Sequence, residues 1–196
     1  LLDHPKVEVI FAEKIIQNRT ASHVYQSIRS QFEWMVFVDV DEFISTRKNK
    51  VRTIREELKQ NFQTADCVKV PWVMMASNNL ERSPESVLHT NVWRWNHDRK
   101  HPNPIHKFRC RFDEIEVKCI FRTCAFDDIS DHHPTAQTRQ EVNVVEAVRN
   151  EPSPLTPFYP NLREESISEA YLVCYHYRIV SRENNDAKLR SNLWYK

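Results

Sequence analysis

The sequence contains no glycine among its 196 residues. At the usual frequency of about 7%, a chain of this length would contain roughly 14 glycines, so a chance absence has a probability on the order of one in a million. Tight turns, helix ends and close approaches to phosphate all favour glycine, because it lacks a Cβ atom. If glycines have been left out of the printed sequence, the spacings between its motifs are lower limits.

Long apolar runs and an excess of one charge are also absent. No run approaches the 18 or so apolar residues that a membrane span requires, and no secretory signal opens the chain. The 28 Lys and Arg residues nearly balance the 27 Asp and Glu residues. Such a balance provides no long-range field for nucleic acid or anionic membrane. We therefore expect residues 1–196 to form a single soluble domain without a nucleic-acid partner.

Cysteine pairs with redox or zinc spacing are missing as well. An odd number of cysteines without a secretory signal favours a reducing compartment, and we expect buried structural thiols. The five residues concerned are Cys67, Cys110, Cys119, Cys124 and Cys174.

The stretch 34–43 carries the clearest chemical signal in the chain. Its five apolar residues, 34–38, predict a strand buried on both faces of a mostly parallel sheet. Asp39, Asp41 and Glu42 follow at the carboxyl end of this strand, where open α/β sheets bind their ligands. By strand alternation, Asp39 and Asp41 should point the same way. Because such close carboxylates repel each other, we predict a hard divalent cation, Mg²⁺ or Mn²⁺, arriving with a phosphorylated substrate.

Hydrophobic periodicity predicts strands and helices around this stretch. A strand over 7–11, a helix over 21–32 and the central strand would form a parallel β-α-β unit. Pro71 favours an edge or a bulge in a later strand. The remaining expected elements are a turn over 45–49, a helix over 51–62, strands over 67–75, 116–121 and 171–178, an extended proline-rich loop over 151–160 and a helix over 182–193.

The segment Asp-Val-Asp-Glu-Phe, residues 39–43, resembles the metal-binding motif of GT-A fold glycosyltransferases. Its Glu-Phe extension resembles glycosyltransferase family 92 and related small glycosyltransferase domains, including viral ones. Three further segments are similar to that family: Trp72 before the polar loop 76–79, Lys-Cys-Ile-Phe-Arg at 118–122 before His132 or His133, and His176-Tyr177 with Ser181 and Lys188.

The resemblance implies an α/β, GT-A-like (Rossmann-like) fold. Its central sheet would be mostly parallel and flanked by helices, with a smaller antiparallel portion on the acceptor side. In such domains an earlier βα unit carries much of the nucleotide-base pocket, and this chain starts too late to show it.

The implied reaction is a metal-dependent transfer of a sugar from a nucleoside diphosphate, most often UDP, to a hydroxyl of a glycan or another acceptor, with inversion. Asp39, Asp41 and His176 would hold Mn²⁺ or Mg²⁺. The donor diphosphate would also meet Lys107, from the basic stretch 97–111, and Arg122. The cysteine argument favours the cytoplasm over the Golgi lumen for such a domain.

The acceptor side and the general base are placed by the same resemblance. Trp72, His132 and His133 would line the acceptor site. Inverting enzymes of this fold place a catalytic carboxylate well after the metal motif, so the candidate bases are Asp127, Asp128 and Asp131. The sequence does not choose among these three.

Two other classes of protein remain open at this point. Haloacid-dehalogenase-like phosphatases also use a hydrophobic strand with Asp-x-Asp, and a later pair such as Asp127-Asp128 to hold Mg²⁺; they prefer Thr or Val where this chain has Phe43. A non-catalytic carbohydrate-binding domain is suggested by the missing nucleotide half. Structural roles are also open for single residues, since Trp72 and His176 would fit a protein core and the aspartates could be solvated or cap helices.

Overall fold

The computed structural model describes residues 6–7, 9, 17–94, 96–98, 110–111, 114–159 and 162–191. The expected strand over 7–11 lies outside these residues apart from Val7 and Val9, and Lys107 lies outside them entirely. In chain order the elements are α1 (Gln17–Ile28), η1 (Arg29–Gln31), β1 (Trp34–Val36), β2 (Glu42–Thr46), α2 (Ile54–Asn61), β3 (Cys67–Met74), α3 (Val87–Thr90), β4 (Cys110–Arg111), β5 (Glu114–Arg122), η2 (Thr123–Ala125), β6 (Phe126–Ile129), β7 (Pro134–Gln137), β8 (Val144–Glu146), β9 (Phe158–Tyr159), α4 (Glu164–Glu169), β10 (Leu172–His176) and α5 (Arg182–Ser191).

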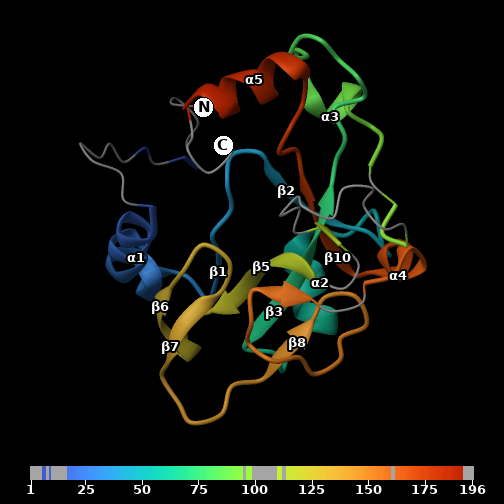
Figure 1. The fold of residues 1–196 in the computed structure, drawn as a ribbon. Helices are drawn as coiled ribbons and strands as arrows, with labels where there is room; N and C mark the ends of the chain where they lie inside the picture. The colour runs from blue at the N-terminus through green and yellow to red at the C-terminus, as the bar shows by residue number, and fades with distance from the viewer. Residues whose placement is uncertain are drawn as a thin grey trace.

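A curled mixed sheet of eight strands forms the centre of the described chain (Figure 1). Its order is β1-β5-β3-β10-β2, with β4 and β9 beside β5 and with β8 beside β3. β3 runs parallel to β8 and β10, whereas the other pairs are antiparallel. The expectation of a mostly parallel sheet is therefore wrong. An apolar run indicates a strand that is buried on both faces, and β3 is buried along its whole length. Such burial does not depend on the direction of the neighbouring strands, so it does not predict a parallel sheet.

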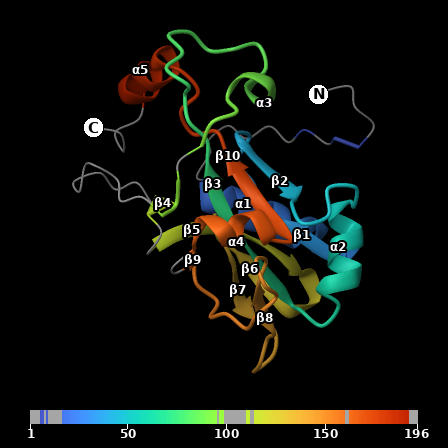
Figure 2. The same cartoon turned by 90° about the vertical axis from the view of Figure 1, so that its right-hand side faces the viewer.

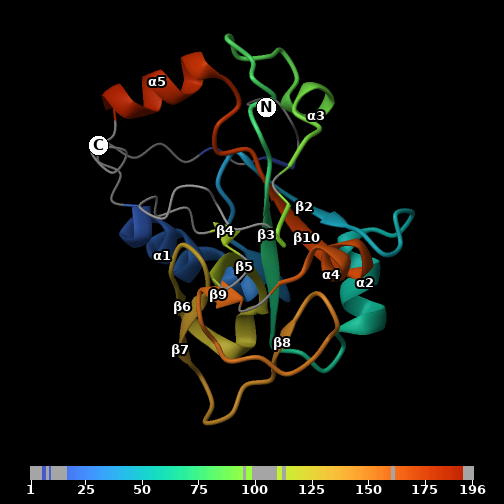
Figure 3. The ribbon, with the colours of Figure 1, turned by 45° about the vertical axis from the view of Figure 1, so that its right-hand side comes forward.

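Helices lie on both sides of the sheet, and further helices and a hairpin lie at the two ends of the molecule. α1 and α4 lie on opposite sides of the sheet (Figures 1 and 2). α3 and α5 lie at one end of the molecule, and the β6–β7 hairpin lies with β8 at the other (Figure 3). The apolar residues of β3 contribute to two clusters, with Val68 and Val70 in one and Cys67 in the other.

The predicted strand over 34–38 is shorter and more exposed than expected. β1 ends at Val36, and among the described strands it pairs with β5 alone. Val36 and Val38 are 37% and 39% exposed, so burial on both faces is wrong. The turn expected over 45–49 is also misplaced, because β2 already runs over Glu42–Thr46. A strand with one neighbour leaves much of its apolar surface uncovered, which the sequence pattern does not reveal.

Pro71 lies inside the central strand β3. The prediction of an edge or a bulge at this proline is therefore wrong. β8 pairs with the start of β3, at Cys67–Lys69, and β10 pairs with its end, at Trp72–Met74. Pro71 falls between these two ladders. Its missing N–H group therefore interrupts neither of them.

The predicted helices are confirmed, and their ends have local causes. The Thr53 side chain accepts a hydrogen bond from the Glu56 amide and Glu56 bonds back to the Thr53 amide, so α2 starts with a capping box. The Ser181 hydroxyl accepts from the Asn184 amide at 3.0 Å and caps α5. In α1, the Tyr25 hydroxyl donates to the carbonyls of Thr123 and Phe126, which attaches the helix to the segment that leads into the β6–β7 hairpin.

Residues other than glycine occupy the left-handed backbone region. Asn78, Asn79, Asn150 and Ala136 have φ between 51° and 62°. Asparagine tolerates this region better than most other side chains, and three of these four positions are asparagines.

Cys67, Cys119 and Cys174 are buried free thiols, as predicted, while Cys124 is exposed. None of the described helices is both long and apolar enough to cross a membrane.

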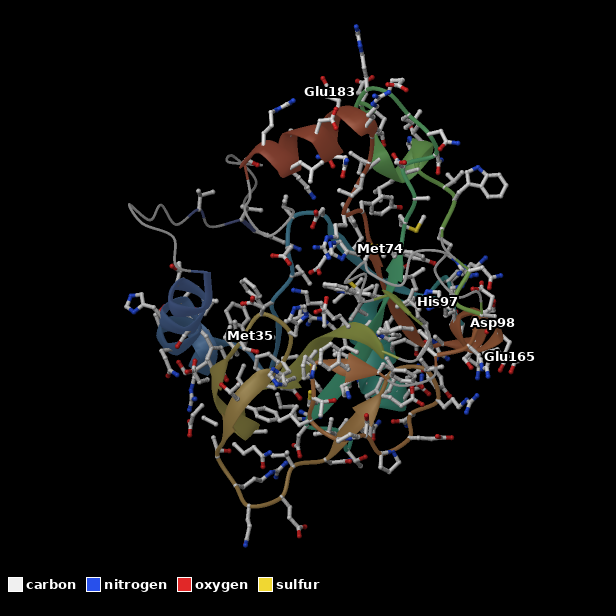
Figure 4. All side chains as sticks on the ribbon, viewed as in Figure 1. Met35, Met74, His97, Asp98, Glu165 and Glu183 are labelled. Carbon is white, nitrogen blue, oxygen red and sulfur yellow. The ribbon has the colours of Figure 1, made fainter. Side chains whose placement is uncertain are left out.

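Stability should depend on pH through the buried His97. This residue lies with Asp98 beside α4, near Glu165 (Figure 4). Burial, together with the nearby Arg94 guanidinium, lowers the pKa of His97 from 6.5 to about 4. The unfolded chain therefore takes up a proton between these values while the folded chain does not. We expect a loss of roughly 3 kcal/mol of unfolding free energy as the pH falls from the upper value to the lower.

Chemical denaturation across this pH range measures the effect. His97→Gln should flatten the profile, whereas His89→Gln on the exposed face of α3 should leave it unchanged. A wild-type profile that is already flat would contradict the prediction.

Candidate active site

Asp39 and Asp41 lie in the turn between β1 and β2, and Glu42 begins β2, so residues 39–42 form an acidic turn. The Glu42 amide donates to the Asp39 carbonyl at 3.1 Å, and the Asp39 amide donates to Glu42 Oε2 at 2.8 Å, so the turn is closed from both sides. Val40 is 95% exposed at its tip. Strand alternation therefore does not apply to Asp39 and Asp41, and the two side chains have different partners.

β10 brings His176 to this turn. His176 is the cross-strand partner of Glu42, and the next residue, Tyr177, donates its amide hydrogen to the Asp41 carbonyl at 2.9 Å. His176 Nε2 is 3.5 Å from Asp41 Oδ1, and its Nδ1 is 4.0 Å from Glu42 Oε1. The imidazole thus lies between two carboxylates, and the fold brings Asp41 and His176 together.

Two lysines from distant parts of the chain face the same carboxylates. Lys118 Nζ, fully buried on β5, is 3.2 Å from both Asp39 Oδ2 and Glu42 Oε2. Lys188 Nζ on α5 is 3.3 Å from Asp41 Oδ2. The site therefore combines three carboxylates, one histidine and two ammonium groups. These ammonium groups reduce the repulsion that would otherwise separate the carboxylates.

The charge of Asp41 follows from its neighbours. Burial raises the pKa of this carboxyl, but His176 and Lys188 outweigh the burial, and together they lower the pKa to about 2. For Glu42, burial raises the pKa although Lys118 acts in the opposite direction. Asp41 is therefore ionised throughout the neutral range and can offer an anionic oxygen to a cation.

Trp72 and His132 complete the inner wall of the site. The Trp72 ring on β3 makes edge-to-face contacts with His176, at 4.3 Å between centroids, and with His132, at 5.2 Å. His132 Nδ1 lies 3.1 Å from the Val117 carbonyl. His133 is engaged within its own loop, because its Nδ1 lies 2.7 Å from Ser130 Oγ. Of the three predicted acceptor residues, Trp72 therefore contacts His176, and His132 contacts Trp72.

The three candidate bases occupy different surroundings. Asp131 adjoins the acidic turn, because its carbonyl accepts a hydrogen bond from Lys118 Nζ at 2.8 Å. Asp127 on β6 instead forms an ion pair with Arg29 at 2.7 Å, and Asp128 accepts from the following amide, that of Ile129. Among the three, Asp131 shares a partner with Asp39 and Glu42.

Arg122 lies apart from the acidic turn. It is the cross-strand partner of Trp34 at the start of β1, and its guanidinium stacks 4.3 Å from the Trp34 ring centroid. The guanidinium also pairs with Glu33 and donates to the Ala65 and Gln63 carbonyls. The structure thus gives Arg122 a set of protein partners at the start of β1, whereas Asp39 follows the other end of this strand. The phosphatase alternative gains no support either, since Asp127 is paired with Arg29.

Three residues of the site had no predicted role: Glu42, Lys118 and Lys188. For Lys118 a signal was present: it stands between Val117 and Cys119 in an apolar strand. A lysine is almost never fully buried unless its charge is paired, so its position predicted an acidic partner. No local pattern indicated that Asp39 and Glu42 would be those partners.

The donor atoms of Asp41 and His176 fit a divalent cation. Two ligands bonded to one ion at about 2.1 Å are separated by no more than about 4.2 Å, and Asp41 Oδ1 and His176 Nε2 are 3.5 Å apart. Within the described part of the chain, no group of three or more His, Cys, Asp or Glu residues is already arranged around one ion position. The pair would therefore supply two ligands of such an ion, and further ligands would have to come from Asp39, water or substrate.

Comparison with known proteins identifies the class to which this fold and site belong. The family model that matches the chain describes glycosyltransferases, and it covers residues 18–189, which include the acidic turn, His176 and Lys188. The chain belongs to glycosyltransferase family 92. A comparison with curated proteins finds no significant match.

Proposed function

We propose that the domain transfers a sugar from a nucleoside diphosphate sugar, a UDP-sugar, to a hydroxyl of a glycan or another acceptor. The transfer proceeds with inversion and with the help of a divalent cation. The observation that carries the proposal is the meeting of Asp41 and His176 beside Asp39 in a member of family 92. These side chains come from the β1–β2 turn and from β10, so the tertiary structure assembles them.

Asp41 and His176 would hold Mn²⁺ or Mg²⁺, with Asp39 binding directly or through water. When bound, such a cation neutralises the charge that develops on the diphosphate as the sugar leaves. Lys188 keeps Asp41 ionised and oriented through its ammonium group, 3.3 Å from Oδ2.

Asp131 is the base that the geometry favours. Its Oδ1 is buried and has no hydrogen-bond partner among the described residues, so it can accept a proton from an acceptor hydroxyl. Lys118 binds the Asp131 carbonyl and also Asp39, which sets the position of the base relative to the acidic turn. Trp72 and His132 would border the acceptor.

Titration calorimetry of UDP into the purified domain tests the proposal. With Mn²⁺ present we expect binding that EDTA abolishes and that Asp41→Ala weakens by at least about 100-fold, because the variant loses an anionic ligand to the cation. Asp127→Ala, which removes a carboxylate of the β6–β7 hairpin, should bind UDP as the wild type does. A folded domain that binds no UDP, or binds it equally well in EDTA, would contradict the proposal for this donor.

A further inference from the structure

Two buried polar atoms of the site face each other without hydrogen-bond partners. Glu42 Oε1 and His176 Nδ1 are both unpartnered among the described residues, and they lie 4.0 Å apart. Glu42 is 5% exposed and His176 is 6% exposed, so bulk water does not reach these atoms. Leaving such a group unsatisfied costs about 1–3 kcal/mol. A hydrogen bond between the two atoms would satisfy both of them.

The other contacts of Glu42 and His176 hold the two side chains in this orientation. Glu42 Oε2 already accepts from the Asp39 amide and from Lys118 Nζ, which fixes the carboxylate. His176 lies on a strand that pairs with β2 on one side and β3 on the other, and its Nε2 faces Asp41. A movement of roughly 1 Å brings Glu42 Oε1 and His176 Nδ1 into hydrogen-bond range.

We propose that Glu42 is a positioning residue for His176. Its Oε1 accepts a hydrogen bond from His176 Nδ1–H, so that Nε2, which faces Asp41, is the nitrogen available to a cation. A histidine binds a metal through a nitrogen without a proton, and the hydrogen bond at the other nitrogen selects which one that is. The role in cation binding rests on the proposed function, whereas the contact between Glu42 and His176 does not.

Lys118 determines how the amide group of a glutamine at position 42 would be oriented. Lys118 Nζ and the Asp39 amide are both donors, and both point at the same Glu42 oxygen. A glutamine at position 42 must therefore turn its amide oxygen toward them and its NH₂ group toward His176. An NH₂ donor requires an acceptor, so His176 Nδ1 would then carry no proton and the ring proton would lie on Nε2, where it blocks cation binding. Glu42→Gln should thus remove the proton from Nδ1 with almost no change in side-chain volume.

The first arm of the test is nitrogen NMR of the histidine side chains in the metal-free protein. The His176 signals are assigned by their loss in His176→Asn. We expect a proton on Nδ1 in the wild type, whether or not Nε2 also donates to Asp41, and no proton on Nδ1 in Glu42→Gln. A wild type without a proton on Nδ1, or a proton on Nδ1 in both proteins, would overturn the proposal whatever the catalytic function is.

The second arm is direct titration of Mn²⁺ in the absence of nucleotide. Glu42→Gln should weaken Mn²⁺ binding by about 10- to 100-fold. Glu33→Gln, which replaces an exposed carboxylate paired with Arg122, should leave the affinity unchanged. Equal affinities of the wild type and Glu42→Gln would overturn the positioning role. A wild type that binds no Mn²⁺ would refute the cation in the proposed function and with it the role of Glu42 toward that cation, while the NMR result would still decide the hydrogen bond.

Discussion

Replacing Lys118 with methionine is expected to lower the unfolding free energy by about 3–5 kcal/mol. The wild-type ammonium is fully buried and lies 3.2 Å from Asp39 Oδ2 and from Glu42 Oε2. Methionine is similar in length but has no charge, so the buried Glu42 carboxylate would lose its cation. The Asp131 carbonyl would also lose its hydrogen bond. Urea denaturation near neutral pH measures the loss.

Two further variants make this result interpretable. Lys59→Met on the exposed face of α2 should change the stability by less than about 0.5 kcal/mol. Adding Glu42→Gln to Lys118→Met removes the uncompensated charge, so the double variant should recover part of the stability, with a coupling of at least about 1 kcal/mol. A loss below about 1 kcal/mol in Lys118→Met alone would show that the network is not what holds the acidic turn in place.

Asp131→Asn is expected to lower kcat by about 10²- to 10⁴-fold, the range typical for removing a general base. Asparagine keeps the size of the side chain and leaves the backbone carbonyl bound to Lys118, but it cannot take a proton from the acceptor. UDP affinity should stay within a few-fold of the wild type, because the side chain is assigned to the acceptor and not to the donor. The measurement is release of UDP from UDP-sugars with a panel of hydroxyl acceptors.

The other two aspartates provide the matched comparison. Asp127→Asn should retain activity, since the Asp127 carboxylate pairs with Arg29 and Asp128 binds its own strand. Asp128→Asn should behave in the same way. If either variant loses activity while Asp131→Asn retains it, the assignment of the base is wrong, although the glycosyltransferase class is not affected.

Much of the local structure could be predicted from the sequence. The helices over 21–32, 51–62 and 182–193 correspond to α1, α2 and α5, and the strands over 67–75, 116–121 and 171–178 correspond to β3, β5 and β10. Helical and strand periodicities depend on neighbours two to four residues away, which a single sequence displays. The resemblance to family 92 is confirmed by the family match over residues 18–189.

The arrangement of the strands could not be predicted in the same way. The run 34–38 indicated an apolar strand, but its place beside β5 alone and its exposure follow from which segments fold against it. Strand direction has the same origin. β1 and β5 lie some eighty residues apart in the chain, and nothing in either segment states that they run antiparallel.

The sequence by itself indicated the family of this protein, through the acidic motif 39–43, a late histidine and the other motifs of family 92. The tertiary structure decided which charges meet. It places Lys118 between Asp39 and Glu42, Lys188 on Asp41, and Asp131 rather than Asp127 or Asp128 beside them. The physical reason is that electrostatic interactions act over a few ångströms in space, whereas these residues are separated by up to 147 positions in the chain.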